Sequence, residues 1–125
     1  MGKAKPKPNR ERENRISMEI VVDCYDEHER ANGWYCYLED QLEFPFTATC
    51  VAKRPTSPLR VKDEVEVIGM PPEDECGHEM LVTIRWDKEG LALPLSQLKP
   101  ISCTDEATKR AVEDWHYWVQ MGYEF

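Results

Sequence analysis

The chain has 125 residues, of which 41% are hydrophobic, and it carries a formal net charge of −8 at pH 7. This length suits one domain with a modest core. No apolar run approaches the roughly 20 residues that cross a bilayer, and no signal peptide opens the chain. These features argue against a membrane protein, and we expect a cytoplasmic one.

The charge is unevenly distributed along the chain. Residues 1–15 contain six basic and two acidic side chains, interrupted by Pro6 and Pro8. A basic segment without apolar periodicity predicts a disordered tail. Its charge of +4 leaves −12 on residues 16–125, which we expect to form a single domain. A domain this acidic repels nucleic acids and anionic membranes, and it attracts cations or basic partners.

A helix is the first element predicted after the tail, over residues 17–31. Asn32 and Gly33 provide a natural end for it. The β-branched run from Ile20 to Val22 leaves a strand as the alternative. The residues that would share one stripe of this helix are Met18, Val21, Val22, Tyr25 and His28.

Short strands are predicted in the middle of the chain. Residues 44–51 alternate as a strand does, with Pro45 at its start or on an edge. Further apolar alternation follows at 59–67, 80–86 and 91–95, and the turn at 87–90 joins the last two segments. Four or five strands in about 60 residues predict a small SH3-like antiparallel β-barrel.

A second helix is predicted at the end of the chain. Thr104 or Asp105 can cap its start, and Gly122 closes it. The apolar stripe of this helix contains Ala107, Ala111, Trp115 and Trp118. The predicted fold class is therefore α+β, with the barrel flanked by an N-terminal and a C-terminal helix.

Two groups of carboxylates lie beside features that break regular structure. The first group, between an aromatic run and the strand at 44–51, is Glu39, Asp40 and Glu43. The second group, between Pro71-Pro72 and Gly77, is Glu73, Asp74 and Glu75. Adjacent like charges repel unless counter-ions or water relax them. Calcium requires six to eight oxygen ligands, which two adjoining acidic loops can supply.

Asp114 is a third candidate, because it borders the apolar face of the C-terminal helix. An acid in that position needs a partner. The partner is either a metal ion or an arginine or lysine. Spacing alone does not separate a calcium site from a solvated acidic surface, and no EF-hand motif is present.

Catalytic and zinc-binding alternatives have weaker support. The three histidines have no recognisable nucleophile partner, and no G-x-S-x-G motif or phosphate-binding glycine loop is present. Cys76 and His78 could bind zinc with Cys50, Cys103 or His116, but the spacing is not a standard one. The five cysteines contain no C-x-x-C pair, and we interpret them as small buried hydrophobes.

Several aromatic and acidic segments together resemble the small bacterial calcium-binding proteins of the CcbP family, over roughly residues 18–125. The segments that carry the resemblance are Gly33–Asp40, Phe44–Ala48, Asp63–Met70, Ile84–Trp86, Leu93–Leu98 and Asp114–Trp118. The resemblance implies calcium binding without EF-hands, by a protein that buffers or senses the ion in the cytoplasm. The acids that match are Glu39, Asp40, Glu43, Glu73, Asp74, Glu75 and Asp114.

We therefore expect a monomeric, non-enzymatic protein whose ligand is Ca²⁺, with no nucleic-acid or membrane partner. The competing interpretation is an SH3-like protein-interaction module whose acidic face docks a basic partner without a specific metal role.

Overall fold

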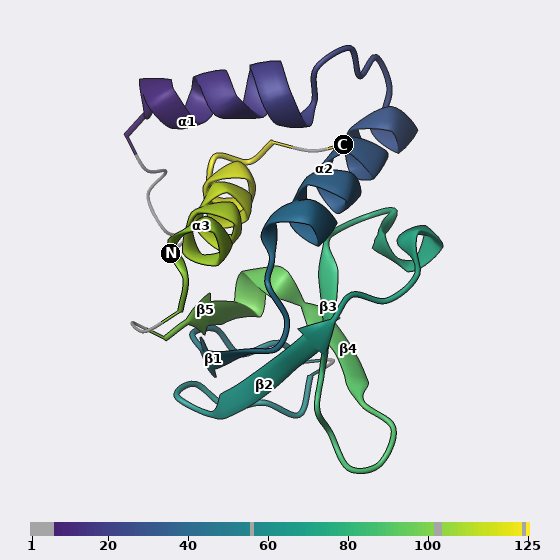
Figure 1. The fold of residues 1–125 in the computed structure, drawn as a ribbon, viewed down its shortest axis with the longest axis vertical. Coiled ribbons are helices and arrows are strands. Elements are labelled where there is room, and N and C mark those ends of the chain that lie inside the picture. Colours follow the sequence, from purple (N-terminus) through teal and green to yellow (C-terminus); the bar gives the residue numbers. More distant parts are fainter. Residues whose placement is uncertain (1–6, 56, 102–103, 124) are drawn as a thin grey trace.

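Three α-helices gather on one side of a five-stranded antiparallel sheet in the computed structural model, which describes residues 7–55, 57–101, 104–123 and 125 (Figure 1). The helices and turns are α1 (Arg10–Arg15), the π-helix η1 (Ile16–Ile20), α2 (Glu27–Gln41), the 3-10 turns η2 (Glu73–Cys76) and η3 (Leu95–Gln97), and α3 (Glu106–Gln120). The strands are β1 (Phe46–Cys50), β2 (Glu64–Gly69), β3 (Leu81–Ile84), β4 (Leu91–Pro94) and β5 (Leu98–Pro100).

The strands lie in the order β4-β3-β2-β1-β5, and each neighbouring pair is antiparallel. Phe46 faces Val67 and Ala48 faces Val65, so alternate residues of β1 and β2 share one buried face. Within the described residues β4 and β5 form the two open edges of this sheet. The α+β class is confirmed, whereas closure into a barrel is not.

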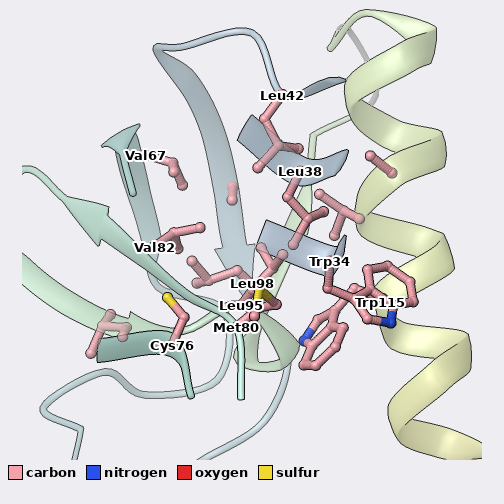
Figure 2. Packing of buried hydrophobic residues seen from close by; sticks show 14 of the residues in the cluster. Trp34, Leu38, Leu42, Val67, Cys76, Met80, Val82, Leu95, Leu98 and Trp115 are labelled. Atoms are coloured by element: carbon pink, nitrogen blue, oxygen red, sulfur yellow. The ribbon is translucent and has the colours of Figure 1, made fainter. Parts of the chain in front are cut away.

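The core lies between the sheet and the helices α2 and α3 (Figure 2). Trp34 and Leu38 project from α2 into this layer and have no exposed surface. The Trp34 ring packs edge-on against Trp115 of α3, with ring centroids 5.0 Å apart. Aromatic pairs of this kind prefer such edge-to-face contacts. The two helices are thereby fixed to each other and to the sheet.

The helix predicted over residues 17–31 is wrong in its boundaries. Residues 16–20 form the π-helix η1, and a new helix, α2, starts only after Asp26. The Asp26 side chain accepts a hydrogen bond from the Glu29 amide at 2.8 Å, which is a standard N-cap. On the predicted stripe, Met18 and Tyr25 are 68% and 82% exposed. Most of the stripe therefore faces solvent, and Val21 is the member that packs against the core.

Asn32 and Gly33 do not end a helix, because both lie inside α2. The buried residues Ala31, Trp34 and Leu38 follow helical spacing and carry α2 through this point. A Cβ atom on Gly33 would lie 2.4 Å from the carbonyl oxygen of Ile20. Glycine is therefore present for close contact with η1, and not as a helix stop.

The expected disorder of the basic tail is wrong for Arg10–Arg15, which form α1. The Asn9 side chain caps α1 by accepting a hydrogen bond from the Arg12 amide at 2.9 Å. Residues 1–6 lie outside the described residues. The proposed single domain from residue 16 onward stays a prediction.

The strand and C-terminal helix predictions are largely confirmed. Strands β1, β2, β3 and β4 lie within or across the predicted alternating segments, and Pro45 directly precedes β1. Asp105 is the N-cap of α3 and accepts from the Thr108 amide at 3.0 Å. Gly122, with φ of 80°, follows the end of α3. No helix in the described part of the chain has the length and apolar character of a membrane span.

Candidate metal site

The first acidic group lies on helix α2 rather than in a loop. Glu39 and Asp40 are exposed in its last turn, where the side-chain Nε2 atom of Gln41 donates to Asp40 Oδ2 at 2.9 Å. Asn32, Tyr35 and Glu39 are spaced at helical intervals and share one face of α2. This face is turned toward the second acidic group.

The second acidic group forms the 3-10 turn η2. Its carboxylates on Glu73, Asp74 and Glu75 are all exposed, while Cys76 is only 1% exposed and anchors the turn in the core. The Glu75 amide donates to the carbonyl oxygen of Pro72 at 3.0 Å. The interpretation of the cysteines as small buried hydrophobes is confirmed for Cys76 and Cys50, and it is wrong for Cys36, which is exposed.

Two direct contacts join α2 to the segment around η2. The Asn32 Nδ2 atom donates to Glu73 Oε1 at 2.5 Å. The Tyr35 hydroxyl donates to the carbonyl oxygen of Pro71 at 2.8 Å. The first contact fixes a carboxylate, and the second fixes the backbone that leads into the turn. The structure therefore brings Glu39 and the η2 acids to the same side of the molecule.

The negative charges of Glu39 and Glu73 both act on Tyr35 and on Cys36. Burial raises the pKa of the Tyr35 hydroxyl, and the charges of Glu39 and Glu73 raise it further. Burial, then Glu73 and Glu39, raise the pKa of the Cys36 thiol. Both groups resist ionisation because a second negative charge there is unfavourable. A cation at this position would be stabilised by the same field.

Glu39 and Glu73 influence the same two side chains, but the carboxylates are not gathered around a point. Among the described residues, no three His, Cys, Asp or Glu side chains are arranged to hold a metal ion. Cys76 and His78 accordingly form no such group with Cys50 or His116, and Cys103 lies outside the described residues. The donor atoms suit calcium chemically, but a coordinating arrangement would require the side chains to move.

Glu43 lies apart from η2. It follows the end of α2, its side chain is exposed, and its backbone amide donates to the Thr108 hydroxyl oxygen at 2.9 Å. Thr108 is in the first turn of α3. The structure therefore places the backbone of Glu43 beside the first turn of α3.

Asp114 is completely buried and is surrounded by donors (0% exposed). Its Oδ1 atom accepts from Arg12 Nη1 at 2.8 Å and from Arg15 Nη2 at 2.7 Å. Its Oδ2 atom accepts from Arg15 Nε at 2.7 Å and from the Tyr37 hydroxyl at 2.8 Å. The structure thus provides the ion-pair partner that was the alternative to a metal. As a calcium ligand, Asp114 stays a prediction, and these contacts leave its oxygens little room for an ion.

The acids Glu64 and Glu66 of β2 lie on the solvent-facing side of the sheet. Glu66 pairs with Arg85 of the neighbouring segment at 3.1 Å, and this ion pair lowers the pKa of the glutamate. Glu64 is exposed. These acids contribute to the overall negative charge and lie outside the acidic groups of α2 and η2.

The sequence prediction missed four residues that shape these groups. Asn32 and Tyr35 connect α2 to η2, and their spacing from Glu39 would have indicated a shared face if the helix had been placed correctly. Arg12 and Arg15 neutralise Asp114 from the segment that was expected to be disordered. No local pattern signals a contact across about 100 residues of chain.

The comparisons with known proteins agree with one another. The solved structure "The crystal structure of Anabaena CcbP" is 40% identical, with a TM-score of 0.85, and the match covers 98% of this chain and 100% of that one. A second structure, "Calcium binding protein in the calcium-binding form", is also 40% identical, with a TM-score of 0.82, and the match covers 94% and 95% of the two chains. No curated protein sequence matches the chain. The model of the CcbP family, described as "Calcium binding", matches residues 14–119, and the chain belongs to this family of calcium-binding proteins.

Proposed function

We propose that the chain buffers or senses cytoplasmic Ca²⁺ through the carboxylates of α2 and η2. We call these five exposed carboxylates the acidic surface: Glu39, Asp40, Glu73, Asp74 and Glu75. The observation that carries the proposal is the contact between Asn32 and Glu73, which joins α2, the helix that bears Glu39 and Asp40, to the second acidic group in a protein of a calcium-binding family.

The donor chemistry of the acidic surface suits calcium better than magnesium. Calcium accepts six to eight oxygens at about 2.3–2.6 Å in flexible geometry, and water can complete the set. Magnesium requires near-ideal octahedral geometry and loses its water reluctantly. Exposed carboxylates on a helix end and a short turn can adjust to the first ion more easily than to the second.

Charge neutralisation supplies the driving force in this proposal. Within the described chain, none of the five carboxylates forms an ion pair with a basic side chain, so their mutual repulsion is unrelieved. A bound cation would replace that repulsion with attraction and would draw the side chains together. The acidic surface would then become more ordered, and the folded state would be stabilised by mass action.

Two acids expected from the sequence are left outside the acidic surface. Glu43 stays a predicted ligand, but its backbone is anchored beside Thr108 in the first turn of α3. Asp114 also stays a predicted ligand, but both of its oxygens accept hydrogen bonds from arginine or tyrosine. A monomeric protein without catalytic activity is sufficient for this function.

Calorimetric titration tests the proposal directly. We expect heat of binding with Ca²⁺, and a much weaker response to Mg²⁺, at near-physiological salt. The double substitution Asp40→Asn and Asp74→Asn should abolish or strongly weaken the calcium response. The matched control, Glu64→Gln with Glu89→Gln, removes two charges from exposed positions elsewhere and should leave most of the binding. An equal response to both ions, or equal loss in both variants, would contradict a specific site.

A further inference from the structure

A cleft of about 430 Å³ lies between the start of α2, the segment that precedes β3 and the end of α3. Its apolar wall is aromatic and comes from the C-terminal part of the chain: Trp115, Trp118, Tyr123 and Phe125. Its polar rim contains Glu27, Arg54, His78 and Glu79. The volume falls within the roughly 300–1,000 Å³ that ligand pockets occupy.

The aromatic wall is held in place from behind. The Trp118 ring is 7% exposed and packs edge-on against Tyr123, with ring centroids 5.2 Å apart. The Tyr123 hydroxyl donates to Glu13 of α1 at 2.6 Å, so the tyrosine is tied to a second helix. Tyr123 and Val119 are 38% and 42% exposed and offer apolar surface to the cleft. A ligand would therefore meet a preformed wall.

The charge of the rim is negative. Glu79 is paired with Arg54 at 3.0 Å, which leaves that pair neutral. Glu27 is exposed in the first turn of α2 and has no ion pair within the described residues. A free carboxylate beside aromatic rings suits a cation, because the ring faces also attract positive charge. The net charge of −8 disfavours an anionic ligand at the same place.

We propose that this cleft docks a lysine or arginine side chain of a partner protein. The cationic head would lie near Glu27, and its aliphatic stem would lie against Tyr123 and Val119. Long basic side chains bury their stems on apolar surface in this way while the charge stays near water. The cleft shares neither Glu39 nor the η2 acids with the acidic surface, so this docking does not depend on the proposed calcium site.

Nuclear magnetic resonance titration in the presence of a calcium chelator tests the proposal on the full chain. The probe is a blocked pentapeptide, acetyl-Ala-Leu-Lys-Leu-Ala-amide, and its comparison carries norleucine in place of lysine. We expect the lysine peptide to shift the backbone amides of Ser96, Val119 and Gly122, which line the cleft. The norleucine peptide should bind about fivefold more weakly, because it lacks the positive charge that would lie near Glu27 and the aromatic wall.

Two exposed acids in the first turn of α2 make a matched pair of variants. Glu27→Gln removes the carboxylate of the cleft, whereas Glu29→Gln removes the same charge from the same turn outside the cleft. We expect Glu27→Gln to lower the affinity for the lysine peptide about threefold, and Glu29→Gln to change that affinity less than about twofold. Equal weakening by both variants would indicate unspecific attraction to an acidic protein. Absence of shifts at the cleft amides, or equal binding of the norleucine peptide, would also overturn the proposal.

Discussion

Arg15 forms a bidentate ion pair with Asp114, in which Nε donates to Oδ2 and Nη2 donates to Oδ1, each at 2.7 Å. The carboxylate is entirely buried, while the arginine side chain is 14% exposed. This pair fastens α1 to α3. It thereby makes a basic segment near the start of the chain part of the folded domain.

Asp114→Asn should destabilise the fold by about 3 kcal/mol, because removal of one partner leaves buried positive charge uncompensated. Chemical denaturation followed by tryptophan fluorescence measures this loss. The control is Glu113→Gln, which alters the exposed neighbour paired with Arg12 at 3.4 Å and should cost less than about 0.5 kcal/mol. Calcium stoichiometry should be the same in folded Asp114→Asn as in the unaltered protein. A lost calcium ion would return Asp114 to the ligand set.

Gly33→Ala should also destabilise the protein, although alanine favours a helix by about 1 kcal/mol over glycine. The new Cβ would lie 2.4 Å from the Ile20 carbonyl oxygen, so η1 and α2 would have to separate. Overpacking of this kind costs about 1–3 kcal/mol, which we expect to exceed the gain. The measurement is the free energy of unfolding in urea.

Gly77→Ala is the control for this substitution. A Cβ there would lie 3.8 Å from the Asp74 carbonyl oxygen, which is ordinary contact, and the backbone already has a right-handed helical conformation. The change should stay within about 0.5 kcal/mol. If Gly33→Ala were as harmless as Gly77→Ala, the close approach of the two segments would be wrong.

Local signals in the sequence were sufficient for α3 and for strands β1 to β4, whereas β5 (Leu98–Pro100) lies outside the predicted segments. Asp105 caps α3 through a contact with Thr108, only three residues away, and the buried Trp115 and Trp118 follow helical spacing. Strands β3 and β4 show alternation and a short connecting turn. Such features depend on neighbouring residues alone, so they can be read before the tertiary structure is known.

The position of α2 could not be read in the same way. Asn32 and Gly33 have the local character of a helix end, but the burial of Trp34 and Leu38 carries the helix past them. The close approach of Ile20 explains why the residue there is glycine. The exposed stripe at Met18 and Tyr25 has helical spacing but no partner surface among the described residues. Periodicity shows that a face exists, but packing decides whether that face is buried.

The acidic groups were visible in the sequence, but their relationship was not. Glu39 and Glu73 are 34 positions apart, and their proximity depends on the contacts that Asn32 and Tyr35 make with the η2 segment. The family resemblance identified the ion, whereas local spacing left a solvated surface as an equal alternative. Contacts between distant segments are set by the whole fold.

Calcium should raise the stability of the protein in proportion to the logarithm of its concentration. At 100 times the dissociation constant of a single site, the gain is about 2.7 kcal/mol. Thermal unfolding at increasing Ca²⁺, with ionic strength held constant by a monovalent salt, measures it. A melting temperature that responds equally to added monovalent salt would indicate screening of surface charge and not binding.

Alkaline pH should weaken the attachment of α1 through Glu13. This carboxylate accepts from the Tyr117 hydroxyl at 2.7 Å and from the Tyr123 hydroxyl at 2.6 Å. The hydrogen bond with Glu13 raises the pKa of Tyr123 from 10.0 to about 12. Because the pKa of Tyr123 is raised in the folded state, its hydrogen bond with Glu13 stabilises the fold fully below about pH 10. This stabilisation is lost as the pH rises through about 12.

Absorbance at 295 nm, which follows tyrosine ionisation, tests this effect. Glu13→Gln should lower the pH at which Tyr123 ionises, and Tyr123→Phe identifies its part of the titration curve. Glu11→Gln alters a carboxylate of the same helix that is 88% exposed, and it should leave the curve unchanged. If Glu11→Gln and Glu13→Gln shifted the curve equally, the general charge of α1 would be responsible.

Coupling between Glu39 and Glu73 would show that α2 and η2 contribute to one calcium site. If Glu39 and Glu73 bind the same ion, either single substitution to glutamine should weaken the site, and the double substitution should cost less than the sum. Two separate sites would give additive losses. Calorimetry on Glu39→Gln, Glu73→Gln and the double variant measures the coupling. The Asn32 contact with Glu73 adds a further test, since Asn32→Ala frees that carboxylate and should change calcium affinity only while Glu73 is present.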